Sequence, residues 1–287
     1  MRTIDWAAHK RHREQVIADH GQWVGIVDED GVPLWDLPPV MTLTAPEVLN
    51  SPESAKGVLH VGGRYGARHP VVEELIADLT DVVSDDGSLS PVSEATRMLV
   101  VERAGGYRRA YTVTHTVATG AAAPEQLEIH AVGVLDVLRT LPAPSRPNSW
   151  TPAFHRLDRD WVKTWVRERD VAGIELEQHR GRAVVEGPAL QAIYEVIGVS
   201  LEAVFRAMGV ADPWPVVVEA PASGGPETVI ALEDRTIWDT IAPYAAAAGV
   251  RVSARLWWPG DPPVGAAHKG NAPTIIIRLK LNRKGTE

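Results

Sequence analysis

Residues 96–120 read TRMLVVERAGGYRRAYTVTHTVATG, and this stretch decides the fold class. Two runs rich in β-branched and aromatic residues flank the pair Gly105-Gly106, which is the pattern of a β-hairpin. A strand places alternate residues on one face, and in the second run these are Tyr111, Val113, His115 and Val117. We therefore expect this hairpin to lie within a β-rich region.

Further strands are predicted on both sides of this hairpin. Residues 23–35, WVGIVDEDGVPLW, are two apolar runs around Asp30-Gly31, a strong turn signal. The segments PVMTLT, GVLHVG and QLEIHAVG also have the composition of strands. Helical spacing predicts helices over residues 5–19, capped by Asp5, over 69–79 and, shorter, over 134–141.

The second half of the chain alternates helices with strands. We predict a helix over 155–170, where Leu157, Trp161 and Trp165 share a face. Residues 188–209 begin with Pro and end with Gly, which predicts a helix that Gly198 could divide in two. A third helix, residues 236–249, begins at the capping residue Thr236. A hairpin is expected over 174–187, and strands over 214–219, near Val229, over 250–258 and over 274–281. The fold class is therefore α+β, with strands in hairpins and single helices between them.

Residues 142–152, PAPSRPNSWTP, carry four prolines and no periodic pattern, which indicates a stiff connection. We place a lobe boundary there. The expected organisation is an N-terminal helical arm (1–20), a β-rich lobe (21–141), this linker (142–152) and an α+β lobe (153–287).

Composition and charge exclude some classes of protein. Hydrophobic residues make up 45% of the 287 residues, which is enough for a packed core. A net charge of −8 argues against a protein that coats nucleic acid or an anionic membrane. Because there is no cysteine, disulfides and thiolate zinc sites are excluded. No run of residues is apolar and long enough to predict a membrane helix.

Few residues suggest catalysis or metal binding. His9 and His12 are spaced to share a helix face, with Asp5 as a third candidate ligand, but basic neighbours disfavour a metal. Three acidic doublets could serve a glycoside hydrolase if the fold brought them together: Glu73-Glu74, Asp85-Asp86 and Glu233-Asp234. The expectation is a protein without a catalytic site, cofactor or metal.

Three segments, in order, resemble minor tail proteins of long-tailed actinobacteriophages. They are WVGIVDEDGVPL with the following GVLHV strand and VVEELI helix, then the hairpin RMLVVERAGGYRRAYTV leading to LEIHAVGVLDVLRTLPAPSRP, and then TIWDTIAPYAAAAGVRVSARLWWPGD. This resemblance implies partly barrel-like lobes of the tail-tip or baseplate-hub class, which assemble as a ring, often a trimer.

The resemblance also implies what the chain binds. Expected partners are distal tail, tape measure and neighbouring minor tail proteins, together with further copies of this chain. A membrane or a specific nucleic acid sequence is not expected. Candidate interface anchors are Trp257, Trp258 and Trp6; because adjacent strand residues point to opposite faces, we expect Trp257 or Trp258 to lie outside the core. Alternatives to a structural role are a tail-associated cell-wall hydrolase and a host-surface carbohydrate-binding module.

Overall fold

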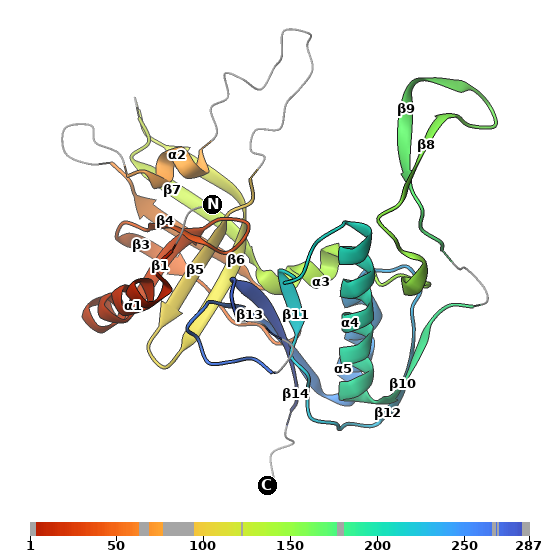
Figure 1. Cartoon of the computed structure of the whole chain (residues 1–287). Helices are drawn as coiled ribbons and strands as arrows, with labels where there is room; N and C mark the ends of the chain where they lie inside the picture. Colours follow the sequence, from red (N-terminus) through yellow and green to blue (C-terminus); the bar gives the residue numbers. More distant parts are fainter. Residues whose placement is uncertain are drawn as a thin grey trace. The chain divides into compact units, whose positions relative to one another are not determined.

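The computed structural model of the chain (Figure 1) describes residues 4–62, 69–76, 95–121, 123–176, 181–265, 268 and 270–282. The chain divides into two compact units. The first comprises residues 1–134, 255–262 and 270–275, and the second comprises the remainder. Antiparallel sheets with single helices between them confirm the predicted α+β class.

The first unit is built on one seven-stranded antiparallel sheet in the order β2-β1-β5-β6-β7-β4-β3. Its strands are β1 Gln22–Val27, β2 Pro33–Asp36, β3 Val40–Thr44, β4 Ser54–His60, β5 Met98–Arg103, β6 Tyr107–Thr119 and β7 Gln126–Gly133. The two edge strands, β2 and β3, are joined by residues 37–39 alone, which span at most roughly 14 Å. The sheet must therefore curl until its edges approach each other at that end.

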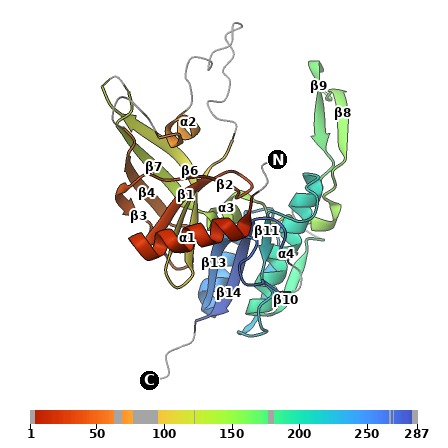
Figure 2. The same ribbon diagram turned by 60° about the vertical axis from the view of Figure 1, so that its left-hand side comes forward.

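Strands β1 and β5 are covered on both faces, which explains their continuous apolar sequences. Val24 pairs with Val101, and both belong to the core inside the curled sheet. On the opposite face, helix α1 (Trp6–His20) packs against β1 and β5 (Figure 2). As predicted, the side chain of Asp5 caps this helix by accepting a hydrogen bond from Ala8 N at 2.9 Å.

The hairpins predicted at Asp30-Gly31 and Gly105-Gly106 are confirmed. In β6 the pairing register shifts between Val113 and His115, so the predicted alternation of one face does not continue along the strand. Helix α2 occupies Val71–Leu75, and residues 77–79 of the predicted helix lie outside the described residues. The short helix after β7 is present as a 3₁₀ turn, Val134–Asp136, followed by α3, Val137–Thr140.

The second unit packs around helix α4 (Ala189–Ala207), which stays continuous through Gly198. It contacts α5 (Ile237–Ala248) and the strands β10 (Val184–Pro188), β11 (Val216–Val218) and β12 (Glu227–Ala231). Thr236 caps α5 by accepting from Asp239 N at 3.0 Å, as predicted. Strands β13 (Val250–Trp257) and β14 (Thr274–Leu281) contribute residues to both units. Across the described residues, no helix has the length and apolar character needed to span a membrane.

The helix predicted over residues 155–170 is wrong, because this segment forms a hairpin of β8 (Phe154–Arg159) and β9 (Thr164–Ala172). Its turn is stabilised by Asp160, whose Oδ1 accepts from Val162 N and Lys163 N, both at 2.8 Å. Such a local bond favours a turn over a helix. The apolar residues that suggested a helix face lie outside the core of this hairpin, and Trp161 is 98% exposed.

The hairpin predicted over residues 174–187 is also wrong where it is described. Residues 174–176 form no strand, and β10 pairs instead with β12, Val185 lying opposite Ile230. The predicted turn at Arg180 lies outside the described residues. Residues 142–152 belong to the second unit, where Ala143 N donates to Arg235 O at 2.7 Å, so the division between units differs from the predicted boundary.

Gly25 provides a test of how tightly α1 and β1 are packed. A Cβ at this position would lie 2.4 Å from Cζ2 of Trp23, whose indole is almost completely buried. We expect Gly25→Ala to lower the free energy of unfolding by about 1–3 kcal/mol, measured by chemical denaturation. The matched control is Gly57→Ala in β4, where the added carbon meets only Leu43 Cδ1 at 3.8 Å. Equal effects of the two substitutions would contradict this packing.

Candidate functional site

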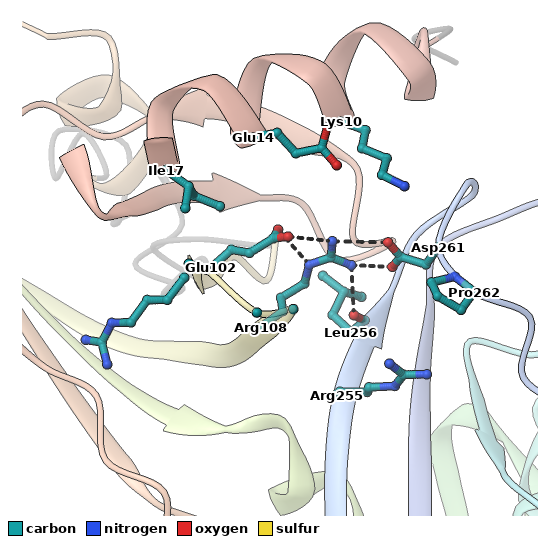
Figure 3. A pocket seen from close by; sticks show the side chains of 13 residues that line it. Lys10, Glu14, Ile17, Glu102, Arg108, Arg255, Leu256, Asp261 and Pro262 are labelled. Atoms are coloured by element: carbon teal, nitrogen blue, oxygen red, sulfur yellow. Dashed lines mark hydrogen bonds and ion pairs between the residues drawn. The ribbon is translucent and has the colours of Figure 1, made fainter. Parts of the chain in front are cut away.

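The candidate site is a pocket of about 390 Å³ in the first unit, centred on Arg108 (Figure 3). Its charged side chains come from α1, from the β5–β6 hairpin and from residues 255–262. They are Lys10, Glu14, Glu102, Arg103, Arg108, Arg255 and Asp261. Segments from both ends of the chain therefore contribute to one polar cluster.

The register of the sheet places the central residues side by side. Glu102 of β5 lies opposite Arg108 of β6, and on its other side it lies opposite Trp23 of β1. Residues opposite each other in an antiparallel sheet point to the same face. This is the face that α1 covers, and Arg13 of α1 donates to Oε2 of Glu102 there.

Arg108 uses all five of its N–H donors within the chain. Nε and Nη2 donate to the two carboxylate oxygens of Glu102 at 2.9 and 3.2 Å. Nη1 and Nη2 donate to the two oxygens of Asp261, and Nη1 also contacts Leu256 O at 3.4 Å. Because guanidinium has five N–H groups, this residue has no donor left for a ligand.

Arg13, Glu102, Arg108 and Asp261 balance one another electrically. Burial opposes the charge of Arg108, but the bonds to Glu102 and Asp261 outweigh it and raise its pKa. Burial likewise opposes the charge of Asp261, yet Arg108 outweighs it and holds the carboxyl pKa below its ordinary value. The pKa of Arg13 is lowered by burial and by the nearby Arg108, and guanidinium still remains charged.

Trp258 lies against this charged cluster. The Cζ atoms of Arg13 and Arg108 are 4.4 and 4.2 Å from the centre of its ring, which is cation–π distance. Its backbone N–H donates to Asp261 Oδ2 at 2.9 Å, and its indole N–H donates to Gly31 O at 2.8 Å. Trp258 therefore connects residues 255–262 to the β1–β2 turn and to α1.

The structure corrects the expectation for the candidate anchors Trp257 and Trp258. We expected one of them to lie outside the core, but they are 3% and 0% exposed. Trp257 is covered within its own unit, where its indole N–H donates to Pro262 O at 3.0 Å and Gly270 lies close to its ring. Trp6 is partly exposed, and its ring stacks on Trp258 at 6.4 Å. Neither Trp257 nor Trp258 presents a surface to a neighbouring protein in this structure.

The proposed metal ligands are used elsewhere. His9 contacts the rings of Trp6, Trp23 and Trp258, and both ring nitrogens are buried without a hydrogen-bond partner among the described residues. His12 faces the carboxylate of Asp36, and Asp5 caps the helix. Within the described part of the chain, no three His, Asp or Glu side chains are arranged to hold a metal ion.

The acidic doublets are also dispersed. Glu74 accepts from Arg97, whereas Glu233 pairs with Arg182 and Arg235. Asp234 accepts from Ser145 N at 2.7 Å. Asp85-Asp86 lie outside the described residues. Glu74, Glu233 and Asp234 are thus each bonded to an arginine or a backbone N–H of this chain.

Sequence patterns did not identify four residues of this site, which are Arg13, Glu102, Arg108 and Asp261. Glu102 and Arg108 stand symmetrically about the turn at residues 104–106, and this opposite-charge pairing was the available signal. The contributions of Arg13 and Asp261 carry no local signal, because they come from sequence positions 89 and 153 residues away from their partners.

Arg108→Met tests whether the cluster stabilises the fold. The substitution leaves the largely buried carboxylates of Glu102 and Asp261 without this ion-pair partner, and we expect a loss of about 3 kcal/mol in the free energy of unfolding. The control is Arg103→Met on the same hairpin, where an exposed side chain bonds Gln22 Oε1 at 3.2 Å and lies 5.6 Å from the ring centre of Tyr107, and where a loss below about 1 kcal/mol is expected. Both are measured by denaturant titration, and a small effect of Arg108→Met would contradict a stabilising role.

We expect the free energy of unfolding to depend on pH because of His9. Burial, aided by Arg13, lowers its pKa from 6.5 to about 4, with Arg108 and His12 acting in the same direction and Asp36 opposing them. Between these two pH values the unfolded chain binds more protons than the folded chain, so stability rises as pH increases from about 4 to 6.5. We expect this contribution to reach about 1–3 kcal/mol and to change little above pH 6.5.

The measurement is chemical denaturation at several pH values for the wild type, His9→Phe and the control His20→Gln. His20 is exposed at the end of the same helix. The stability of His9→Phe relative to the wild type should be greater at pH 5 than at pH 8. His20→Gln should show the same pH dependence of stability as the wild type. Parallel curves for the wild type and His9→Phe would show that His9 is not buried in its neutral form.

No protein-family model and no curated protein matches this chain. Among solved structures it is similar to one described as the tail protein from Neisseria meningitidis MC58, with 12% sequence identity and a TM-score of 0.35. The match covers 90% of this chain and 50% of that chain, so this chain spans half the length of that protein. The chain is thus distantly similar in structure to a tail protein.

Proposed function

We propose that this chain is a structural protein of a phage tail, located at the tail tip or baseplate hub. In this role it binds distal tail, tape measure and neighbouring minor tail proteins, and it assembles with further copies of itself. The three quoted segments that resemble actinobacteriophage minor tail proteins support the proposal. Two of them meet at the Arg108 cluster: the β5–β6 hairpin supplies Glu102 and Arg108, and the third segment supplies Trp258 and Asp261.

The observation that carries the proposal is the use of Arg108. A buried arginine that binds a substrate must keep donors free for it, whereas Arg108 directs all five toward oxygen atoms of its own chain. Its partners are fixed in turn, because Glu102 also binds Arg13 and Asp261 also accepts from Trp258 N. The most buried charges of the pocket are thus bonded to one another and stabilise the first unit. A structural protein of a phage particle requires such internal stability.

One observation favours a second candidate, a host-surface carbohydrate-binding module. Trp161 is 98% exposed at the turn of the β8–β9 hairpin, and an exposed indole can stack on a sugar ring. Trp161→Ala should abolish binding of the purified protein to host cells if this candidate is correct. A structural tail protein would show no such binding in the wild type.

The decisive experiment compares phage particles with and without the gene for this chain. Purified particles should contain the protein by mass spectrometry, and antibody labelling in electron micrographs should place it at the tail tip. Deleting the gene should give heads without complete tails, because a missing hub protein blocks tail assembly. If the protein is abundant in the lysate but absent from purified particles, the proposal is wrong.

A further inference from the structure

We call the β8–β9 hairpin, residues 154–172, the arm. It forms a two-stranded sheet of its own, and Figures 1 and 2 show it extending away from α4 as a narrow ribbon. All six residues of β8 are exposed, and so are all of β9 except Trp165, which is partly exposed. An isolated two-stranded hairpin is only marginally stable in water, so contact with further residues that cover the arm would stabilise it.

Apolar side chains lie along the whole arm and on both of its faces. The exposed ones are Phe154 (61%), Leu157 (41%), Trp161 (98%), Val162 (78%), Val166 (103%) and Val171 (42%). Phe154 lies opposite Ala172 at the base, whereas Leu157 lies opposite Arg169 on the other face. A lipid surface would take only the turn of such a ribbon, whereas a protein groove covers its full length. The distribution therefore favours a protein partner.

The arm and the rest of the chain carry net charges of opposite sign, which favours a second copy of this chain as the partner. Residues 154–172 contain five Lys and Arg against four Asp and Glu, a net charge of +1. The whole chain carries −8, which leaves −9 for the rest. An arm of opposite sign is attracted to the body of another copy, while bodies without arms repel one another. In size the arm also approaches one side of a standard protein interface, which uses about 20–30 residues.

We propose that the arm of one copy docks on the body of a second copy and holds the copies of this chain together. One arm and one acceptor surface per chain form a head-to-tail contact, which gives a ring where the rotation between neighbouring copies closes and an open filament where it does not. The proposal deepens the proposed function, because it rests on self-assembly in a tail and names the segment responsible. It assigns the uncovered apolar side chains to an interface.

The test uses the full chain and an arm-deleted chain in solution. Phe154 and Ala172 are paired at the base, so a short Gly-Ser linker between residues 153 and 173 can replace the arm without stretching the body. A second variant, Trp161→Ser with Val166→Ser, leaves the length unchanged. Its control is Val229→Ser, a valine 57% exposed in β12. Mass is measured by light scattering over a range of concentrations, and thermal unfolding verifies that each body is folded.

The wild type and Val229→Ser should form a closed oligomer. The arm-deleted chain should be monomeric, and the double substitution should raise the dissociation constant at least tenfold. A photo-crosslinking residue at position 166 should give a product of twice the chain mass containing only peptides of this protein. A wild type that stays monomeric, an oligomer that survives deletion of the arm, or a crosslink in purified particles to a different tail protein would each overturn the proposal.

The proposed function fails separately from this inference. Absence from purified particles contradicts the tail role even when the arm controls the oligomer in solution. Conversely, presence at the tail tip with an oligomer that does not depend on the arm contradicts only the inference.

Discussion

The guanidinium of Arg108 holds the first unit together, because its two carboxylate partners lie on different parts of the chain. Glu102 is its neighbour across the β5–β6 hairpin, whereas Asp261 comes from the C-terminal part of the sequence. Arg13 of α1 binds the same Glu102. Two positive and two negative groups thus share a buried site. Burying such charges is costly unless each has an opposite charge and the remaining hydrogen-bonding groups are satisfied, so the cluster stabilises the unit only when all four residues are present.

This requirement explains the aromatic residues around the cluster. Trp258 lies against the guanidinium groups of Arg13 and Arg108, and Trp23 lies near that of Arg13; Trp23 is itself accommodated because residue 25 has no side chain. The enclosure has a consequence for His9, which the same indoles surround without giving its nitrogens a partner. The neutral form of the imidazole is the one that this environment tolerates. The enclosure by these indoles therefore accounts both for the stability of the ion pairs and for the acid sensitivity that we expect at His9.

Local patterns in the sequence predicted most elements, whereas pairing between distant segments was not predictable. The cap at Thr236, the turn at Gly105-Gly106 and the proline and glycine that flank α4 are signals within a few residues, and each was found. The partnership of β10 with β12, and of Asp261 with Arg108, depends on the folded chain. Trp257 and Trp258 show the same limit. Trp258 follows the last residue of β13, so alternation does not fix the direction of its side chain, and alternation does not show which faces are covered.

The arm shows a different reason for failure. Trp161 and Trp165 have helical spacing, and burial usually decides between a helix and a strand in such a segment. The observed hairpin leaves Trp161 exposed, so burial does not explain the choice, and the turn formed by Asp160 favours the hairpin locally. A segment selected to fit its own core keeps a periodic apolar face, whereas one that meets another molecule need only match that partner. Exposed apolar residues on both faces of one ribbon fit the second requirement, which is why the arm has the sequence of an interface and lacks that of a core element.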